Sequence, residues 1–407
     1  MWQPCVLLKY GELMLKGRNR GRFENLLIRN ARRALSELPH PVRVRRRRGL
    51  LLLSAPDHPE LQTELVARAR QLIGVSVVQP AIRVDRTPEA AVDAALRLAR
   101  RARPAATAAF AVRARRRHKD FPMTSSQLQA HLGDRIHAAL GWPVDLTAPE
   151  VEIAVEVDLH EIFVSVERYR GLDGLPVGSS GRALALLSGG YDSPVAAFRL
   201  MRRGLACDFV HFTGAPLTGP ASAYKAYALA RRLARFQGET RLWLVPLGQA
   251  QRELALAGAG ALQIVAQRRL MLRVADRIAR GHGAHALVTG DSLGQVSSQT
   301  LSNLGTVERA AELPVLRPLL AWGKEEIMAE AGRLGTAEIS RLPDEDCCSL
   351  LLPRSVATRT TPAQLDGFER RLDLDDTVEA LLAKAQCLPV CAGAGEDADV
   401  PSRRAAS

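Results

Sequence analysis

The sequence predicts an α/β protein whose second half forms a doubly wound parallel sheet, preceded by two smaller α+β segments. Three observations predict this fold. Strand-like and helix-like stretches alternate from about residue 183 onward, as is typical of parallel sheets covered on both faces. A serine- and glycine-rich turn stands between the first of these strands and the following helix. The excess of positive charge is confined to the first 120 residues, which sets that part of the chain apart.

The first segment, residues 1–58, begins with a short apolar run at 6–9. Apolar residues then recur at helical spacing over 22–38. Residues 42–53 predict a strand pair or one long strand. The prolines between 56 and 59 mark a boundary, because proline interrupts both helices and sheets.

The second segment, residues 59–168, has the same mixture of patterns. We expect its second helix to begin after Thr124 or Ser125, since both side chains cap helix N-termini well. The elements predicted in this segment are helices at 89–101 and 123–139 and strands at 109–115, 151–157 and 162–166.

The main domain, predicted at 182–360, follows a glycine- and serine-rich linker at 169–181. Its expected strands lie at 183–187, 207–212, 242–245 and 286–289. Residues 361–407 are expected to form a helix at 377–385 and a polar tail.

The distribution of charge indicates a polyanionic partner. Residues 1–120 hold 26 Lys and Arg against 10 Asp and Glu, a net charge of +16, whereas the remaining 287 residues sum to −3. Neutralising phosphates with such a surface releases counterions and gives sequence-independent affinity. We therefore expect nucleic acid to bind this part, through Arg113, Arg115, Arg116, Arg117 and Lys119. The alternative is a solvated basic face.

Composition excludes several classes of protein. Hydrophobic residues make up 47% and charged residues 24%, as in an ordinary globular chain. The longest apolar stretch, 254–266, is too short to cross a bilayer, and no signal peptide is seen, so we expect a cytoplasmic protein without membrane contact. The six cysteines form no CxxC pair, so we expect no iron–sulfur cluster and no definite metal site.

The most specific motif is Ser188-Gly189-Gly190-Tyr191-Asp192-Ser193, between a buried strand and an apolar helix. Glycines let the backbone approach phosphate oxygens, and the helix N-terminus supplies amide donors. Because the loop has no lysine, it is not the P-loop of NTPases. It resembles instead the PP-loop of ATP pyrophosphatases, which cleave ATP between its α and β phosphates.

A second polar patch, 287–300, also follows a strand, where open α/β sheets bind ligands. Together the patches resemble the tRNA 4-thiouridine synthases, the ThiI family of tRNA uracil 4-sulfurtransferases. The segment from Tyr10 to Asn19 is similar to that family's ferredoxin-like domain, and Phe110 to Ser125 is similar to its RNA-binding THUMP domain. The resemblance thus implies a ferredoxin-like domain at 1–58, a THUMP domain at 59–168 and a PP-loop domain at 182–360.

The resemblance also implies the site residues. Cys347 falls in register with the cysteine that carries the persulfide, and Asp192 would hold a metal ion or orient the loop. Lys324 is a candidate contact to the adenylate and Cys348 a candidate resolving thiol. The residues implied in ATP binding are Leu186, Leu187, Ser188, Gly189, Gly190, Ser193, His211, Phe212, Arg268, Gly290 and Gln299.

The implied reaction uses ATP and Mg²⁺ to adenylate O4 of a uridine, at position 8 of tRNA. A persulfide on Cys347, charged by a cysteine desulfurase, then delivers sulfur to C4. Longer members append a rhodanese domain with a second essential cysteine; only 47 residues follow Thr360, so we expect a short form without it.

Alternatives remain open at this point. The chain could be another PP-loop tRNA-modifying enzyme, or a non-catalytic THUMP RNA-binding protein. The sequence does not decide whether the protein also supplies sulfur for the thiazole of thiamine. It also leaves open which desulfurase serves it, which thiol or reductant resolves Cys347, and whether it forms a homodimer.

Overall fold

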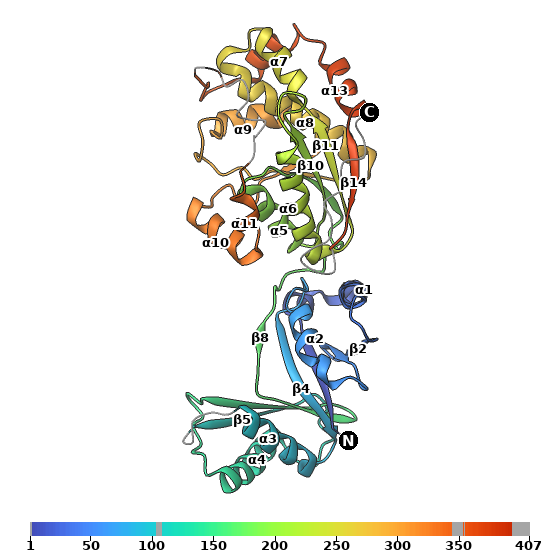
Figure 1. Ribbon diagram of the computed structural model, residues 1–407. Helices are drawn as coiled ribbons and strands as arrows, with labels where there is room; N and C mark the ends of the chain where they lie inside the picture. Colours follow the sequence, from blue (N-terminus) through green and yellow to red (C-terminus); the bar gives the residue numbers. More distant parts are fainter. Residues whose placement is uncertain (1, 103–107, 344–352, 354, 393–407) are drawn as a thin grey trace. The chain divides into compact units, whose positions relative to one another are not determined.

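The computed structural model describes all residues except 1, 103–107, 344–352, 354 and 393–407, so Cys347 and Cys348 lie outside the described residues (Figure 1). The chain divides into two compact units, Met1–Pro176 and Val177–Ser407. No helix in the described part is long and apolar enough to cross a membrane.

The first unit is built on one eight-stranded sheet, in the order β2-β3-β1-β4-β7-β6-β5, with β8 also paired to β4. Its strands are β1 (Gln3–Lys9), β2 (Arg43–Arg47), β3 (Leu50–Ser54), β4 (Val77–Asp85), β5 (Phe110–Arg116), β6 (Val151–Val157), β7 (Glu161–Ser165) and β8 (Tyr169–Arg170). Of the two alternatives expected for residues 42–53, a strand pair or one long strand, the structure has the pair, β2 and β3.

Strand β4 joins the two halves of this sheet. Its residues pair antiparallel with all of β1, and Ile82 to Asp85 also pair with β7 on the other side. We did not predict this strand, because Pro80 within it is unfavourable for a sheet interior. The two N-terminal segments therefore share a single sheet rather than two separate ones.

Each half of the sheet has its own pair of helices. Helices α1 (Arg20–Leu35) and α2 (Gln62–Ala69) pack on the half that contains β1 and β3. Helices α3 (Pro88–Ala102) and α4 (Ser125–Leu140) pack on the half that contains β5, β6 and β7. The predicted N-cap is confirmed: Thr124 accepts from the backbone N–H of Gln127, whose side chain accepts in return from that of Thr124.

The second unit contains the predicted parallel sheet, in the order β13-β12-β9-β10-β11-β14. Its strands are β9 (Arg182–Leu186), β10 (Ala206–Thr213), β11 (Thr240–Pro246), β12 (Leu287–Val288), β13 (Val315–Leu316) and β14 (Gln386–Val390). All pairs are parallel except that of β11 with β14, which is antiparallel. The doubly wound fold is confirmed.

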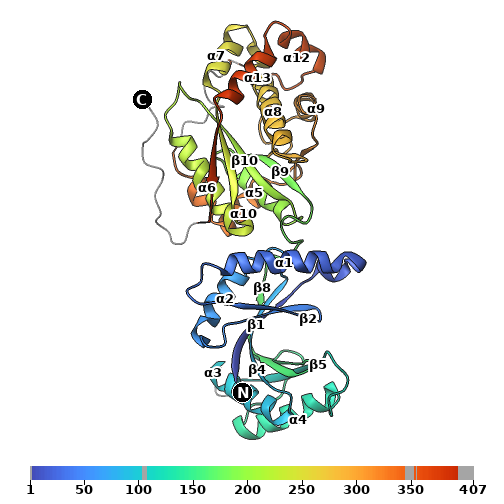
Figure 2. The ribbon, with the colours of Figure 1, turned by 90° about the vertical axis from the view of Figure 1, so that its right-hand side faces the viewer.

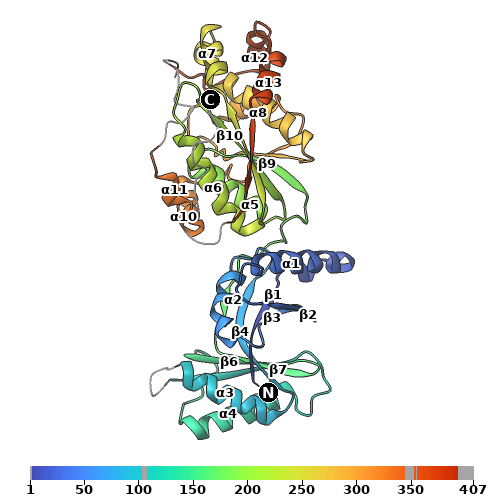
Figure 3. The same ribbon diagram turned by 45° about the vertical axis from the view of Figure 1, so that its right-hand side comes forward.

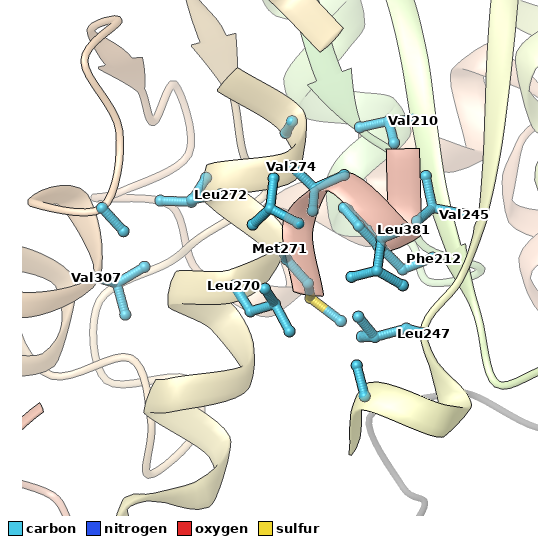
Figure 4. Close-up of a cluster of buried hydrophobic side chains, with 14 of the residues drawn as sticks. Val210, Phe212, Val245, Leu247, Leu270, Met271, Leu272, Val274, Val307 and Leu381 are labelled. Carbon is cyan, nitrogen blue, oxygen red and sulfur yellow. The ribbon is translucent and has the colours of Figure 1, made fainter. Parts of the chain in front are cut away.

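Helices cover both faces of this sheet (Figures 2 and 3). One face carries α5 (Asp192–Met201), α6 (Ala221–Gln237), α10 (Lys324–Leu334) and α11 (Ala337–Ser340). The other carries α7 (Gly248–Leu256), α8 (Gln263–Gly281), α9 (Leu301–Glu308), α12 (Pro362–Glu369) and α13 (Leu374–Ala383). The central helix of that layer, α8, packs Met271 and Val274 against Val210, Phe212 and Leu381 in the largest apolar cluster (Figure 4).

The C-terminal segment is part of the second unit. Residues 386–390, which follow the predicted helix and were expected to belong to the polar tail, form β14, and Cys387 pairs there with Trp243 of β11. The sequence did not show this strand because Pro389 lies within it, and an edge strand tolerates proline.

A buried ion pair connects helix α12 to helix α8. Arg269, with its side chain only 2% exposed, donates to Glu369 at 2.6 and 2.8 Å and to the backbone carbonyl of Thr306 at 2.8 Å. Removing one partner of such a pair leaves a buried charge uncompensated. Among the described residues, Arg269 would then keep only the exposed carboxylate of Asp366, 2.7 Å from its Nη2, as a charged partner. We therefore expect Glu369→Ala to lower the free energy of unfolding, measured by urea denaturation, by up to about 3–5 kcal/mol. The matched control is Glu379→Ala, which removes the partner of the exposed Arg277 and should change stability little.

Candidate functional site

The Ser-Gly-Gly loop lies between β9 and α5, at the carboxyl end of the parallel sheet. It is closed by its own hydroxyls. The Ser193 hydroxyl accepts from the backbone N–H of Ser188 at 2.9 Å and lies 3.1 Å from the Ser188 hydroxyl. The Gly190 N–H donates to that Ser188 hydroxyl at 3.3 Å. This tight turn leads directly into the N-terminus of a ten-residue helix, where amide groups favour an anion.

The second polar patch meets this loop at Gly290. A Cβ atom at position 290 would lie 2.7 Å from the backbone N of Ser193 and 2.9 Å from the carbonyl carbon of Asp192. Only glycine therefore lets the segment after β12 come this close to the start of α5. The close approach explains why the two motifs form one site.

Asp192 is the first residue of α5 and is held from two sides. One carboxylate oxygen accepts from the Nζ of Lys324 at 3.1 Å, and the other accepts from the Nε2 of Gln295 at 3.0 Å. The Lys324 ammonium also lies 5.5 Å from the centre of the Tyr191 ring. The structure thus brings together Asp192 and Lys324, which the sequence placed 132 residues apart.

Asp291 holds two arginine side chains of the site in place. Its buried carboxylate accepts from the guanidinium of Arg268, from the Nε of Arg317 at 3.3 Å and from the Thr289 hydroxyl at 2.8 Å. The Nε2 of Gln299 lies 3.4 Å from the same carboxylate. We did not predict Asp291 or Arg317 as site residues. The available signal was an acidic residue three positions after the apolar strand β12, in the patch where open α/β sheets bind ligands.

His211 and Phe212 lie at the carboxyl end of β10, beside the strand that leads into the Ser-Gly-Gly loop. The buried His211 ring donates from Nδ1 to the carbonyl of Leu187 at 2.8 Å. The backbone N–H of Leu187 in turn donates to the carbonyl of Val210 at 2.8 Å. These bonds fix the backbone just before Ser188. The residues predicted to bind ATP at 186–188 and at 211–212 therefore lie next to each other at the carboxyl end of the sheet.

Several buried amide atoms near these residues lack a partner in the described part of the chain. They are Oε1 of Gln295, Oε1 of Gln299, and both Oε1 and Nε2 of Gln267, which precedes Arg268. Buried polar atoms are almost always hydrogen-bonded. Unsatisfied amide groups beside a glycine loop and a helix N-terminus therefore indicate that a polar ligand binds at this place.

The basic residues predicted for nucleic-acid binding lie in the first unit, on and after β5. Arg113, Arg115 and Lys119 are exposed, and Nη1 of Arg116 donates to the carbonyl of Lys119 at 3.2 Å. Arg117 instead pairs with the buried Glu156, which also contacts Lys9. Burial alone would raise the pKa of Glu156, but Lys9 and Arg117 outweigh it and hold this pKa below its usual range. Arg117 therefore supports the fold, and its neighbours are the more available cations.

Comparison with known proteins gives the family. The chain is 61% identical over 382 residues to the protein of Nocardia farcinica named "Probable tRNA sulfurtransferase", covering 93% of this chain and 92% of that one. The model of the family described as "Thiamine biosynthesis protein (ThiI)" matches residues 178–374. The chain belongs to the ThiI family. The ThiI ferredoxin-like domain matches residues 5–78 and the THUMP domain residues 85–167.

Other ThiI-family proteins are also similar over nearly the whole chain. A "Probable tRNA sulfurtransferase" of Thermus thermophilus is 45% identical and covers 93% of this chain and 92% of its own. The crystal structure of a 4-thiouridine synthetase in complex with RNA and bound ATP superposes with a TM-score of 0.87 at 30% identity, covering 95% of this chain and 100% of that one. The three-part architecture inferred from the sequence is confirmed, whereas our numerical domain limits stay a prediction.

Proposed function

We propose that this ThiI-family protein is an ATP-dependent tRNA sulfurtransferase that converts a uridine of tRNA, at position 8, to 4-thiouridine. The observation that carries this proposal is the junction of the Ser188–Ser193 loop with the Gly290 segment at the carboxyl end of the sheet. The relatives named tRNA sulfurtransferases, and the similar synthetase crystallised with RNA and ATP, support the substrates.

The chemistry needs a better leaving group than oxygen at C4 of the uracil. Transfer of AMP from ATP to O4 supplies one and releases pyrophosphate. In this chain the backbone amides of residues 188–193 would hold the phosphates, and Arg268 would add positive charge as pyrophosphate leaves. Asp291 keeps that guanidinium in place, and Gly290 keeps the two loops in contact.

Mg²⁺ fits the same edge of the sheet. Asp192 offers carboxylate oxygens beside the phosphate loop, which together with phosphate oxygens are ligands that magnesium prefers. When bound, the ion would neutralise the negative charge of the polyphosphate. In this structure the Asp192 carboxylate is paired with the Lys324 ammonium, so the two groups lie side by side. We assign Asp192 to hold the metal ion and Lys324 to face the adenylate.

The sulfur step rests on Cys347, which lies outside the described residues. We propose that a cysteine desulfurase charges this thiol as a persulfide, whose terminal sulfur attacks C4 and displaces AMP. This attack leaves a disulfide between Cys347 and the new sulfur on C4. The thiol of Cys348, or an external thiol, then attacks the Cys347 sulfur, which releases 4-thiouridine and leaves a disulfide on Cys347 that a further external thiol reduces. We also retain as proposals a cytoplasmic location, a homodimer, a contribution to thiamine thiazole synthesis and the absence of an iron–sulfur cluster.

The first unit would bind tRNA through exposed cations on and after β5. We expect the double variant Arg115→Glu, Lys119→Glu to weaken tRNA binding and to reduce the log–log salt slope by about 1.4–1.8, because each phosphate contact contributes about 0.7–0.9. Filter binding between 50 and 200 mM salt measures both. The control, Arg252→Glu with Arg309→Glu, reverses the same amount of exposed charge in the second unit. An unchanged slope in the first variant would mean that this cluster is a solvated face.

The adenylation half of the proposal can be tested without any sulfur donor. Purified protein with ATP, Mg²⁺ and unmodified tRNA should release pyrophosphate and transfer labelled AMP to the tRNA. A tRNA in which uridine 8 is replaced by cytidine should not be labelled. Labelling of that tRNA would favour a different PP-loop enzyme, and tRNA binding without any pyrophosphate release would favour a non-catalytic RNA-binding protein.

A further inference from the structure

Two histidines and a glutamate converge in the first unit, and neither the adenylation site nor the tRNA-binding proposal uses any of them. His40 lies between α1 and β2, His58 precedes the short helix η3 (Pro59–Leu61), and Glu60 lies within it. Their ligand atoms, one from each residue, all lie within 4.8 Å of one another. In the part of the chain that the structure describes, no other group of three His, Cys, Asp or Glu side chains meets in this way.

The hairpin of β2 and β3 brings these loops together. Arg43 pairs with Ser54 in this hairpin, so the chain three residues after His40 lies opposite the chain four residues before His58. Both histidines precede a proline, Pro41 and Pro59, which disfavours the α-helical conformation for the preceding residue and so limits its backbone freedom. The ligands therefore stand on stiff segments, and little chain entropy is lost when they are held together.

The side chains already contact one another. The imidazole rings of His40 and His58 are stacked, with centres 3.4 Å apart and planes 10° from parallel. Nδ1 of His58 lies 3.0 Å from a carboxylate oxygen of Glu60. Both histidines are partly exposed and Glu60 is exposed, so an ion from solvent can reach all three.

We propose that His40, His58 and Glu60 form a binding site for a divalent late first-row transition ion such as Zn²⁺. Two imidazole nitrogens and one carboxylate oxygen are a common ligand set for zinc, with water in the remaining position. Binding requires the stacked rings to tilt so that one nitrogen of each faces the ion. The ion would join the loop after α1 to the loop after β3, and so stabilise the first unit without taking part in adenylation.

Equilibrium dialysis of the full-length protein against ZnCl₂ tests this site. Thiols are first blocked with N-ethylmaleimide, because the exposed Cys387 and Cys391 would also bind zinc. His40→Gln and His58→Gln should each bind one equivalent of zinc less than wild type. His131→Gln, which alters a partly exposed histidine on α4, should bind as much as wild type.

A second readout separates coordination from a change of folding. Cu²⁺ bound to the thiol-blocked wild type should show an electron paramagnetic resonance spectrum with two nitrogen ligands, which is lost in His58→Gln. Circular dichroism should show that all variants retain the fold. Equal zinc binding by wild type and both site variants would overturn the proposal, as would the same loss in His131→Gln.

Discussion

Replacing Asp192 by alanine is expected to reduce tRNA-dependent adenylation by at least about 10²-fold, the loss typical when one preorganised electrostatic group is removed from an active site. Asp192 stands at the first position of α5, where it receives Gln295 and Lys324 from two other segments. Without its carboxylate, Lys324 loses its partner and the loop loses its candidate metal ligand. tRNA affinity should stay near that of wild type, because the exposed basic residues lie in the other unit.

Pyrophosphate release and filter binding, measured on the same preparations, check this expectation. Lys324→Met should reduce adenylation in the same direction. Glu325→Gln, which changes the exposed neighbour of Lys324, serves as the matched control and should leave both quantities unchanged. A parallel loss of adenylation and tRNA binding in Asp192→Ala would contradict the division of labour between the two units.

Cys347→Ala is expected to abolish transfer of sulfur while adenylation continues. If Cys347 carries the persulfide, its loss removes the nucleophile but not the activated uridine. Single-turnover reactions with a cysteine desulfurase, followed by nucleoside mass spectrometry, measure the transfer. Full thiolation by Cys347→Ala would refute the assignment of this cysteine.

The remaining cysteines are expected to matter much less, and the double variant Cys387→Ser, Cys391→Ser should keep most of the activity. Cys387 is held in β14, and although the residue is exposed, desolvation by the surrounding protein raises the pKa of its thiol, which lowers its thiolate fraction. Burial likewise raises the pKa of Cys207 to about 12, so that thiol is inert at neutral pH. An inactive double variant would mean that Cys387 or Cys391, and not Cys348 or an external thiol, resolves the disulfide on Cys347.

Much of the fold could be predicted because local patterns and tertiary structure agree. The strands β9 to β12 are apolar runs bounded by turns, and Thr124 has the capping partner that its sequence spacing requires. Of the strands that escaped prediction, β4 and β14 each contain a proline, whereas β8 and β13 are only two residues long. Their pairing depends on partners far along the chain, which no local pattern records.

The candidate site was predictable where glycine and serine spacing reflects a loop geometry, as at 188–193 and at Gly290. It was not predictable where function depends on contacts between distant segments. The family resemblance gave Arg268, Asp192 and Lys324 as site residues. It did not give Asp291, which holds Arg268 in place, or Arg317, which pairs with the same carboxylate, because a charged residue read alone is indistinguishable from a solvated one. Arg117 shows the reverse case, since it belongs to a basic cluster yet its side chain is 7% exposed and neutralises Glu156.

The central claim is that this protein makes 4-thiouridine in tRNA by an ATP-dependent step at the Ser188–Ser193 loop. Mass spectrometry of tRNA nucleosides from a strain lacking the gene, complemented with wild type or with Asp192→Ala, tests it most directly. We predict that 4-thiouridine is absent from the deletion strain, returns with the wild-type gene and does not return with the variant. Undiminished 4-thiouridine in the deletion strain, or its full return with Asp192→Ala, would contradict the assignment.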